Sequence, residues 1–263
     1  DDILEENGRA HRTPECFEAY KWASDLDFDQ INIDLIAGMV GETESNWKDS
    51  VSKALELQPD CLTVYQMELP FNTIYSKEGL GGTGAVADWE TKRRWAEYAF
   101  SEFVKAGYHQ SSAYTVVRDP DTRFVYRDAL WEGADMLGTG VASFGHFQGF
   151  HMQNVDGIET YNDMIEAGNL PLGRSYELEP REMLIREFVL QLKKGRVEGA
   201  YFRDKFGADV CAEFQEQLNN HRDNGFLEIT ETGDIQVTSS GLLRVDSLLE
   251  PFFEDRHRGA RYT

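Results

Sequence analysis

The stretch that decides the fold is INIDLIAGMVGETESNWKDSV, residues 31–51. Its first seven residues predict a strand, and Asp34 is the acid at the centre of this otherwise apolar run. A turn containing Gly38 and Gly41 follows, and residues 44–57 then place apolar side chains at helical spacing. A strand that carries a carboxylate and ends in a glycine turn raises the question of a site at this point of the fold.

The same alternation of helix and strand extends to both sides of this stretch. Helix-separated strands are typical of a parallel sheet, open or closed into a barrel, with ligands at the carboxyl ends of the strands. We interpret GLGGTG, residues 79–84, as a connection and not a phosphate loop, because it neither follows a strand directly nor carries the Lys-Ser/Thr pair of such loops. The predicted helices are 14–26, 44–57 and 89–107, and the predicted strands are 31–37, 61–69 and 108–117.

Beyond Pro120 the pattern changes. Residues 128–154 are rich in glycine and aromatic residues without a helical period, which predicts loops and short strands beside the mouth of a barrel. Helices return from about Glu179, and two short strands then turn at residues 232–234 before a final helix, an order typical of a winged-helix-like domain. We therefore expect three parts, residues 1–120, 121–175 and 176–263.

Composition excludes several classes of function. The chain has 47 acidic and 26 basic residues, and its formal charge of −21 repels nucleic acids and anionic lipids. No apolar run reaches the roughly 18 residues of a membrane span, so we expect a cytoplasmic protein. The three cysteines, Cys16, Cys61 and Cys211, are too far apart to indicate a disulfide framework or a zinc site.

Asp34 has two readings from its position alone. A carboxylate near the end of a strand can cap the next helix or pair with an arginine, or it can accept hydrogen bonds from the two hydroxyls of a ribose. The glycines that follow, Gly38 and Gly41, stand where the backbone can approach another group closely. This favours the ligand-binding reading without deciding it.

Six segments, in order along the chain, carry a resemblance to known proteins. The segments are GRAH (8–11), INIDLIAGMVGETESNW (31–47), LQPDCLTVYQMELP (57–70), ALWEGADMLGTGVAS (129–143), MQN (152–154) and GFLEITETGDIQVTSSGLLRVDSLL (225–249). Together they resemble the radical SAM proteins related to oxygen-independent coproporphyrinogen III oxidase, over nearly the whole chain from Asn7 to Phe253. The resemblance implies an α/β fold, with the last strands of a TIM-type barrel followed by a mainly helical, winged-helix-like domain.

The resemblance implies a binding site for S-adenosyl-L-methionine. Asp34 matches the family's strand acid that holds the ribose hydroxyls. Arg9 matches the arginine that reaches the methionyl carboxylate, a task that suits a bidentate guanidinium. Ile36 and Glu68 match positions that contact the adenine, and Gly38 completes the implied cofactor-binding set. No catalytic residue and no metal ligand is assigned.

On the substrate side, the resemblance implies a tetrapyrrole, with Trp131, Thr139 and Val141 as candidate contacts. The implied activity is oxidative decarboxylation of porphyrinogen propionates, with an electron donor such as flavodoxin or ferredoxin. Two alternatives stay open: another radical SAM activity of the group, such as a C-methyltransferase, a cyclopropanase or a haem-degrading enzyme, and a non-catalytic haem-binding carrier.

The chain departs from the family's pattern at several points. The usual turn GLPxQT is here GMVGET, with Val40 in place of the proline and Glu42 near the usual glutamine; HQSSAYT (109–115) and YR (126–127) also differ. The CxxxCxxC loop that holds a [4Fe–4S] cluster is absent from this sequence. We expect a carboxyl-terminal portion, inactive alone, whose cluster ligands lie upstream; a degenerate protein is the alternative.

Two histidines, His146 and His151, stand five residues apart in GHFQGFH. This spacing suggests a metal site, but no third ligand stands at a matching distance in the sequence. We interpret the pair as structural or substrate-facing.

Overall fold

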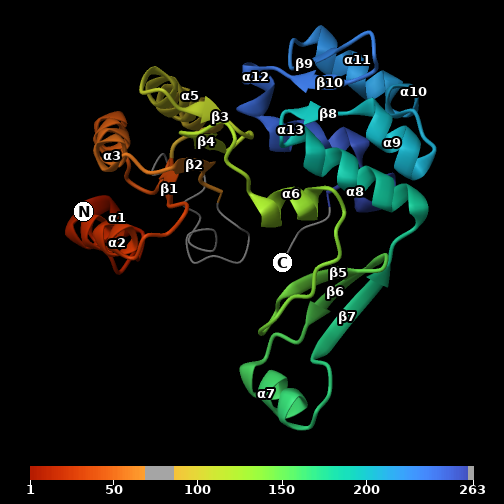
Figure 1. Ribbon diagram of the computed structural model, residues 1–263, viewed down its shortest axis with the longest axis horizontal. Coiled ribbons are helices and arrows are strands. Elements are labelled where there is room, and N and C mark those ends of the chain that lie inside the picture. Colours follow the sequence, from red (N-terminus) through yellow and green to blue (C-terminus); the bar gives the residue numbers. More distant parts are fainter. Residues whose placement is uncertain (69–85, 260–263) are drawn as a thin grey trace. The chain divides into compact units, whose positions relative to one another are not determined.

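A computed structural model of the chain describes residues 1–68 and 86–259. The glycine-rich segment 79–84 lies outside these residues. The chain forms two compact units (Figure 1). The first unit comprises residues 1–122, 239–245 and 259–263, and the second comprises residues 123–238 and 246–258.

The first unit contains a sheet and the helices around it. The structure confirms the helices predicted from periodicity and the first two strands, to within a few residues at their ends. Its elements are α1 (Asp2–Glu6), α2 (Thr13–Asp25), β1 (Asn32–Ala37), α3 (Glu44–Leu57), β2 (Cys61–Gln66), α5 (Trp89–Lys105), β3 (His109–Gln110), β4 (Thr115–Val117) and α12 (Ser239–Leu242).

Local signals explain where the two long helices begin and end. The hydroxyl of Thr43 accepts a hydrogen bond from the backbone N–H of Asn46, which caps α3. The carboxylate of Asp88 caps α5 in the same way, by accepting from the backbone N–H of Thr91. Gly107 follows α5 with a φ of +94°, a conformation that stops a helix at little cost only for glycine.

The sheet corrects one prediction. Its strand order is β1-β2-β4-β3; β1 and β2 are parallel, but β4 is antiparallel to β2. The single strand predicted at 108–117 is a hairpin, because the Ser112 hydroxyl accepts hydrogen bonds from the backbone N–H groups of Tyr114 and Thr115, each at 3.2 Å, and turns the chain. The described strands form an open sheet, so barrel closure stays a prediction.

One face of this sheet is covered by α3 and α5 (Figure 1). Trp47 of α3 is almost fully buried, and its indole N–H donates to the backbone oxygen of Trp95 in α5 at 2.7 Å. The alternate residues of β1 point to the other face, where Asn32 and Asp34 are exposed. The core comprises Ala37, Trp47, Val51, Ala54, Leu62, Val64, Trp95, Ala96, Ala99, Phe103, Tyr108 and Val116.

The second unit contains two three-stranded sheets, β5-β6-β7 and β8-β10-β9. The predicted turn at 232–234 is confirmed, since β9 and β10 pair across it. Its elements are α6 (Val125–Trp131), β5 (Phe144–Phe147), β6 (Phe150–Asn154), α7 (Ile158–Glu166), β7 (Leu172–Glu177), α8 (Pro180–Leu192), β8 (Arg196–Val197), α9 (Gly199–Phe206), α10 (Val210–Glu213), α11 (Gln215–Asp223), β9 (Leu227–Ile229), β10 (Ile235–Val237), α13 (Val245–Leu249), η1 (Glu250–Phe252) and η2 (Asp255–His257).

The sequence reading missed five of these α-helices and strands. Helix α6 begins just before the segment 128–154, for which no helix was predicted, and extends into it; α7, β7, β8 and α9 were not anticipated either. None is longer than the nine residues of α7, so tertiary contacts and not periodicity decide them. The core around α8 is aromatic: the ring of Phe188 lies 4.7 Å from that of Phe214 and 5.0 Å from that of Phe252.

Among the described residues, no helix combines the length and the apolarity that crossing a bilayer requires.

Candidate functional site

A polar ladder crosses the face of the first sheet that α3 and α5 leave uncovered. The Asn32 amide donates to Oδ1 of Asp34 at 2.6 Å, and the Thr63 hydroxyl donates to the Asn32 oxygen at 3.0 Å. Thr63 is in turn hydrogen-bonded to the hydroxyl of Thr115 at 3.2 Å. One carboxylate oxygen of Asp34 is therefore fixed by a neighbour, and the side chain stays exposed to accept hydrogen bonds from a ligand.

Ile36 lies on the same face, and its partner in the β1–β2 register is Tyr65. The Tyr65 ring stacks on that of Tyr114, with centroids 6.1 Å apart. Burial raises the pKa of the Tyr65 hydroxyl, and the charge of Asp34 raises it further. Sequence reasoning did not select Thr63 or Tyr65, although the period of two along CLTVYQ would have placed both on one face of β2.

The turn after β1 contains an internal anion. The Glu42 carboxylate accepts hydrogen bonds from the backbone N–H groups of Gly38 and Met39, at 2.7 and 3.2 Å. Burial raises the pKa of Glu42, whereas these two donors lower it, and the net shift is upward. The carboxylate thus occupies the backbone donors at this end of the strand.

Backbone conformation and packing both require glycine at position 38. Its φ is +90°, and a Cβ there would lie 2.7 Å from Cγ of Lys92. The close approach expected at this glycine is thus made to a side chain of α5. Its inclusion in a cofactor site stays a prediction.

Lys92 is itself buried, and its ammonium donates to the backbone oxygen of Met67 at 2.7 Å and lies 4.6 Å from the centre of the Trp89 ring. Burial lowers the pKa of Lys92, and the charges of Glu68 and Asp88 oppose this shift. Glu68 is exposed at the end of the described chain after β2.

Helix α1 is tied to the turn after β1. The Asn7 amide donates to the Val40 backbone oxygen and its oxygen accepts from the Val40 N–H, both at 3.0 Å. Arg9 follows two residues after this link, exposed and with no ion pair to any described residue. No hydrogen bond joins Arg9 to Asp34 within the described chain, so the structure places Arg9 close to the turn without bringing the two side chains into contact.

The candidate substrate contacts belong to the second unit. Trp131 is half-buried, and the Arg127 guanidinium lies over its ring at 5.3 Å and over that of Phe124 at 4.5 Å. Thr139 and Val141 are exposed in the loop before β5.

That loop is held by Asn154, the last residue of the MQN segment. Its buried amide donates to the backbone oxygens of Gly138 and Gly140, at 3.0 and 2.9 Å. The motif thus fixes the loop that carries Thr139 and Val141.

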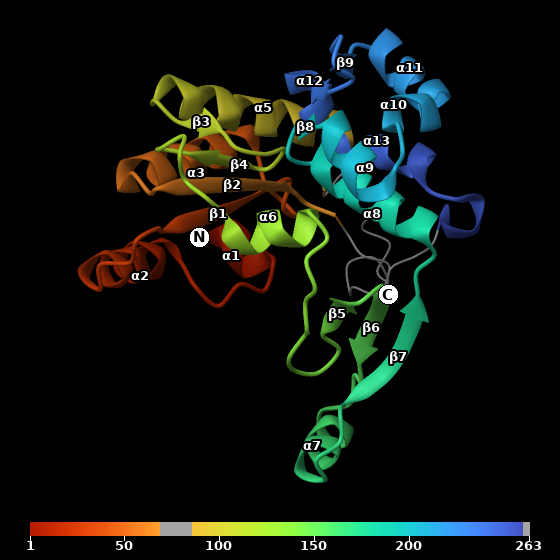
Figure 2. The same ribbon diagram turned by 45° about the vertical axis from the view of Figure 1, so that its right-hand side comes forward.

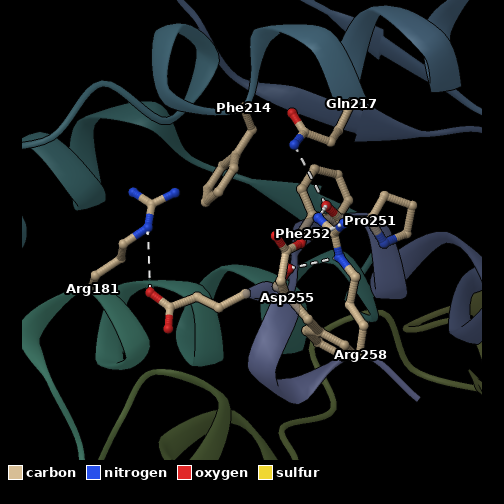
Figure 3. A pocket seen from close by; sticks show the side chains of 9 residues that line it. Arg181, Phe214, Gln217, Pro251, Phe252, Asp255 and Arg258 are labelled. Atoms are coloured by element: carbon tan, nitrogen blue, oxygen red, sulfur yellow. Dashed lines mark hydrogen bonds and ion pairs between the residues drawn. The ribbon is translucent and has the colours of Figure 1, made fainter.

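A pocket of about 330 Å³ lies elsewhere in the second unit, between α8, α11 and the segment that contains η1 and η2 (Figure 3). Phe214 and Phe252 line it, but its two arginines are already paired: Arg181 with Glu213 and Glu254, and Arg258 with Asp255. Neither guanidinium is left for a ligand.

Three ligand atoms of Glu182, Glu254 and His257 lie within 4.8 Å of one another. The Arg256 guanidinium lies 3.3 Å from Glu182 and 2.9 Å from Glu254, so a cation is already present among these acids. A metal ion would have to displace it.

The cysteines do not fit an iron–sulfur cluster. Cys16 is exposed on α2, Cys61 is buried in β2, and Cys211 belongs to the second unit. Three thiolates from one short loop are needed for such a cluster, and these residues share no loop.

No protein-family model matches the chain. The heme chaperone HemW of Bacillus subtilis is 24% identical over 244 residues, covering 92% of this chain and 64% of the relative. Oxygen-independent coproporphyrinogen III oxidase of Helicobacter pylori is 22% identical over 243 residues, covering 86% of this chain and 52% of the relative.

The fold has a counterpart among solved structures. Coproporphyrinogen III oxidase (HemN) from Escherichia coli, described as a radical SAM enzyme, matches 95% of this chain and 61% of its own, with a TM-score of 0.78 and 19% identity. The chain is related to both kinds of protein. It spans between about half and two thirds of the length of these relatives.

Proposed function

We propose that the face bearing Asp34 is the nucleoside-binding part of a radical SAM protein, and that it holds S-adenosyl-L-methionine. The observation that carries this proposal is the exposed Asp34 carboxylate on β1, with Oδ1 held by Asn32 of the same strand. A fixed carboxylate suits the two hydroxyls of a ribose. Beside it, Ile36 and the Tyr65 ring offer a surface on which an adenine can pack.

The other proposed contacts follow from the resemblance. Arg9 binds the methionyl carboxylate, Gly38 permits close approach of the backbone, and Glu68 borders the adenine. S-adenosyl-L-methionine, when bound beside a reduced [4Fe–4S] cluster, supplies a 5′-deoxyadenosyl radical. In this proposal, the residues of this chain bind and orient the cofactor. Its three cysteines take no part in the reaction.

Isothermal titration of the chain with S-adenosyl-L-methionine tests the proposal. Asp34→Asn should weaken binding at least tenfold, because an amide can no longer accept from both hydroxyls. Asp49→Asn is the matched control, since this exposed acid of α3 pairs with Lys53 on the same helix. Equal affinity of the Asp34 variant and the unchanged chain would refute the assignment.

For the whole protein we propose a tetrapyrrole-related role, either oxidative decarboxylation of propionates or haem transfer. Trp131, Thr139 and Val141 are the proposed substrate contacts, and a flavodoxin or ferredoxin is the proposed electron donor for the enzyme. The carrier is kept because a relative named as a heme chaperone matches 92% of the chain. Formation of 5′-deoxyadenosine by reconstituted protein supports the enzyme, whereas haem binding without that product supports the carrier.

A further inference from the structure

Figure 2 shows the β5-β6-β7 sheet, and the strand registers place histidines and aromatic residues on one of its faces. His146 and His151 are direct partners across β5 and β6, and Tyr176 of β7 is the next partner of His151. The ring of Phe144 stacks on that of His151, with centroids 5.5 Å apart. Phe144 and Tyr176 are 45% and 43% exposed, so this face offers rings to a ligand.

Arg186 of α8 supplies a positive charge that acts on both histidines. Burial lowers the pKa of each histidine, and the Arg186 charge lowers it further, so both are neutral near pH 7. The charge of Asp135 raises the pKa of His146, whereas that of Lys205 lowers it. The charge of Arg174 lowers the pKa of His151.

Two polar atoms of this cluster lack partners. Nδ1 of the 6% exposed His146 and Nη1 of Arg186 are buried and form no hydrogen bond with any residue that the structure describes. Arg186 also has no ion pair within the described ranges 1–68 and 86–259, in a chain where acids outnumber bases by 47 to 26. An unpaired buried guanidinium nitrogen is costly, so a partner is expected there.

Two acids of α8 near Arg186 already have other hydrogen-bonding or ionic partners. Glu187 accepts hydrogen bonds from Lys205 and Tyr201, and Glu182 accepts from Tyr176 and lies beside Arg256. A metal ion at His146 would face the Arg186 charge, which disfavours it. A carboxylate can instead accept from Arg186 and from the Nδ1–H tautomer of His146.

We propose that this face, formed by Phe144, His146, His151, Tyr176 and Arg186, binds a planar small molecule through one of its carboxylates. The carboxylate lies against Arg186 and His146, and the ring lies against the exposed aromatic side chains. The choice of a tetrapyrrole as this molecule rests on the proposed function, and the recognition of a carboxylate does not.

The test titrates the chain with coproporphyrin III and with its tetramethyl ester, followed by porphyrin absorbance and fluorescence. The free acid should bind at least tenfold more tightly than the ester, and Arg186→Gln should remove most of that preference. Arg196→Gln, an exposed arginine of β8 paired with Asp234, should leave it unchanged. Arg186→Lys keeps the charge and should retain part of the preference, and far-UV circular dichroism checks that each variant is folded.

Three outcomes would overturn the proposal: equal binding of acid and ester, a folded Arg186→Gln variant with unchanged preference, or no porphyrin binding at all. Asp34→Asn separates this site from the nucleoside site. It should leave porphyrin binding unchanged, so loss of S-adenosyl-L-methionine binding and loss of porphyrin binding report on different proposals.

Discussion

The ion pair between Glu187 and Lys205 is expected to stabilise the second unit, and replacement of Lys205 measures its contribution to the free energy of unfolding. The Lys205 ammonium donates to both carboxylate oxygens of Glu187, at 2.8 and 2.9 Å, and the Tyr201 hydroxyl donates to one of them at 2.6 Å. Glu187 is 7% exposed in its side chain, whereas Lys205 is 40% exposed. Lys205→Met therefore leaves a buried carboxylate with one neutral donor from this cluster.

Removal of one partner of a fully buried pair costs about 3–5 kcal/mol. Because Lys205 is partly exposed and Tyr201 remains, we expect Lys205→Met to lower the free energy of unfolding by about 2–3 kcal/mol. Urea unfolding followed by far-UV circular dichroism measures this change. Lys194→Met is the control, since the carboxylate that it leaves behind, Glu132, is 50% exposed and stays solvated, so the loss should be less than about 1 kcal/mol.

A double variant tests whether the uncompensated charge of Glu187 causes the loss of stability in Lys205→Met. Glu187→Gln combined with Lys205→Met removes the uncompensated charge, so the double variant should be more stable than Lys205→Met alone. Equal losses for Lys205→Met and Lys194→Met, or a double variant less stable than both single variants, would contradict the reasoning.

Two further predictions concern a glycine and a histidine. Gly38→Ala should destabilise the chain more than Gly107→Ala in urea unfolding, because both have φ near +90° but only the Cβ at Gly38 meets Lys92; equal losses would exclude the clash. Burial lowers the pKa of His221, so the unfolded state takes up more protons as the pH falls below about 6.5, and stability is lost from there until the folded-state pKa is passed. His221→Gln should reduce the loss between pH 7.5 and 5.5, and an unchanged loss would assign it to other groups.

The helices of the first unit could be predicted from the spacing of apolar residues in the sequence. Helix α3 begins at its Thr43 cap and ends before Gln58, as the spacing of Trp47, Val51 and Ala54 indicates. Asp34 was selected because a carboxylate stands out in an apolar strand, and the exposed polar face confirms that this side chain is not buried.

The rest depends on contacts between distant residues. The reversal of β4 comes from one hydroxyl, Ser112, whose hydrogen bonds cannot be read from a strand-like pattern. In the Arg186 cluster, the arginine stands 40 residues after His146 and 35 residues after His151 in sequence (186 − 146 and 186 − 151), so no local motif joins it to them. Gly38 was assigned to ligand binding, but its packing against Lys92 requires the position of α5.

Glu42 in the turn after β1 has a consequence for selectivity by charge. Backbone N–H groups at such strand ends commonly receive phosphate groups in nucleotide-binding proteins. Here the Glu42 carboxylate already accepts from the N–H groups of Gly38 and Met39, so an incoming phosphate meets a negative charge in place of free donors. If the proposed nucleoside site lies here, we expect this end of the sheet to discriminate against di- and triphosphates and to accept a nucleoside that carries an ammonium or sulfonium group.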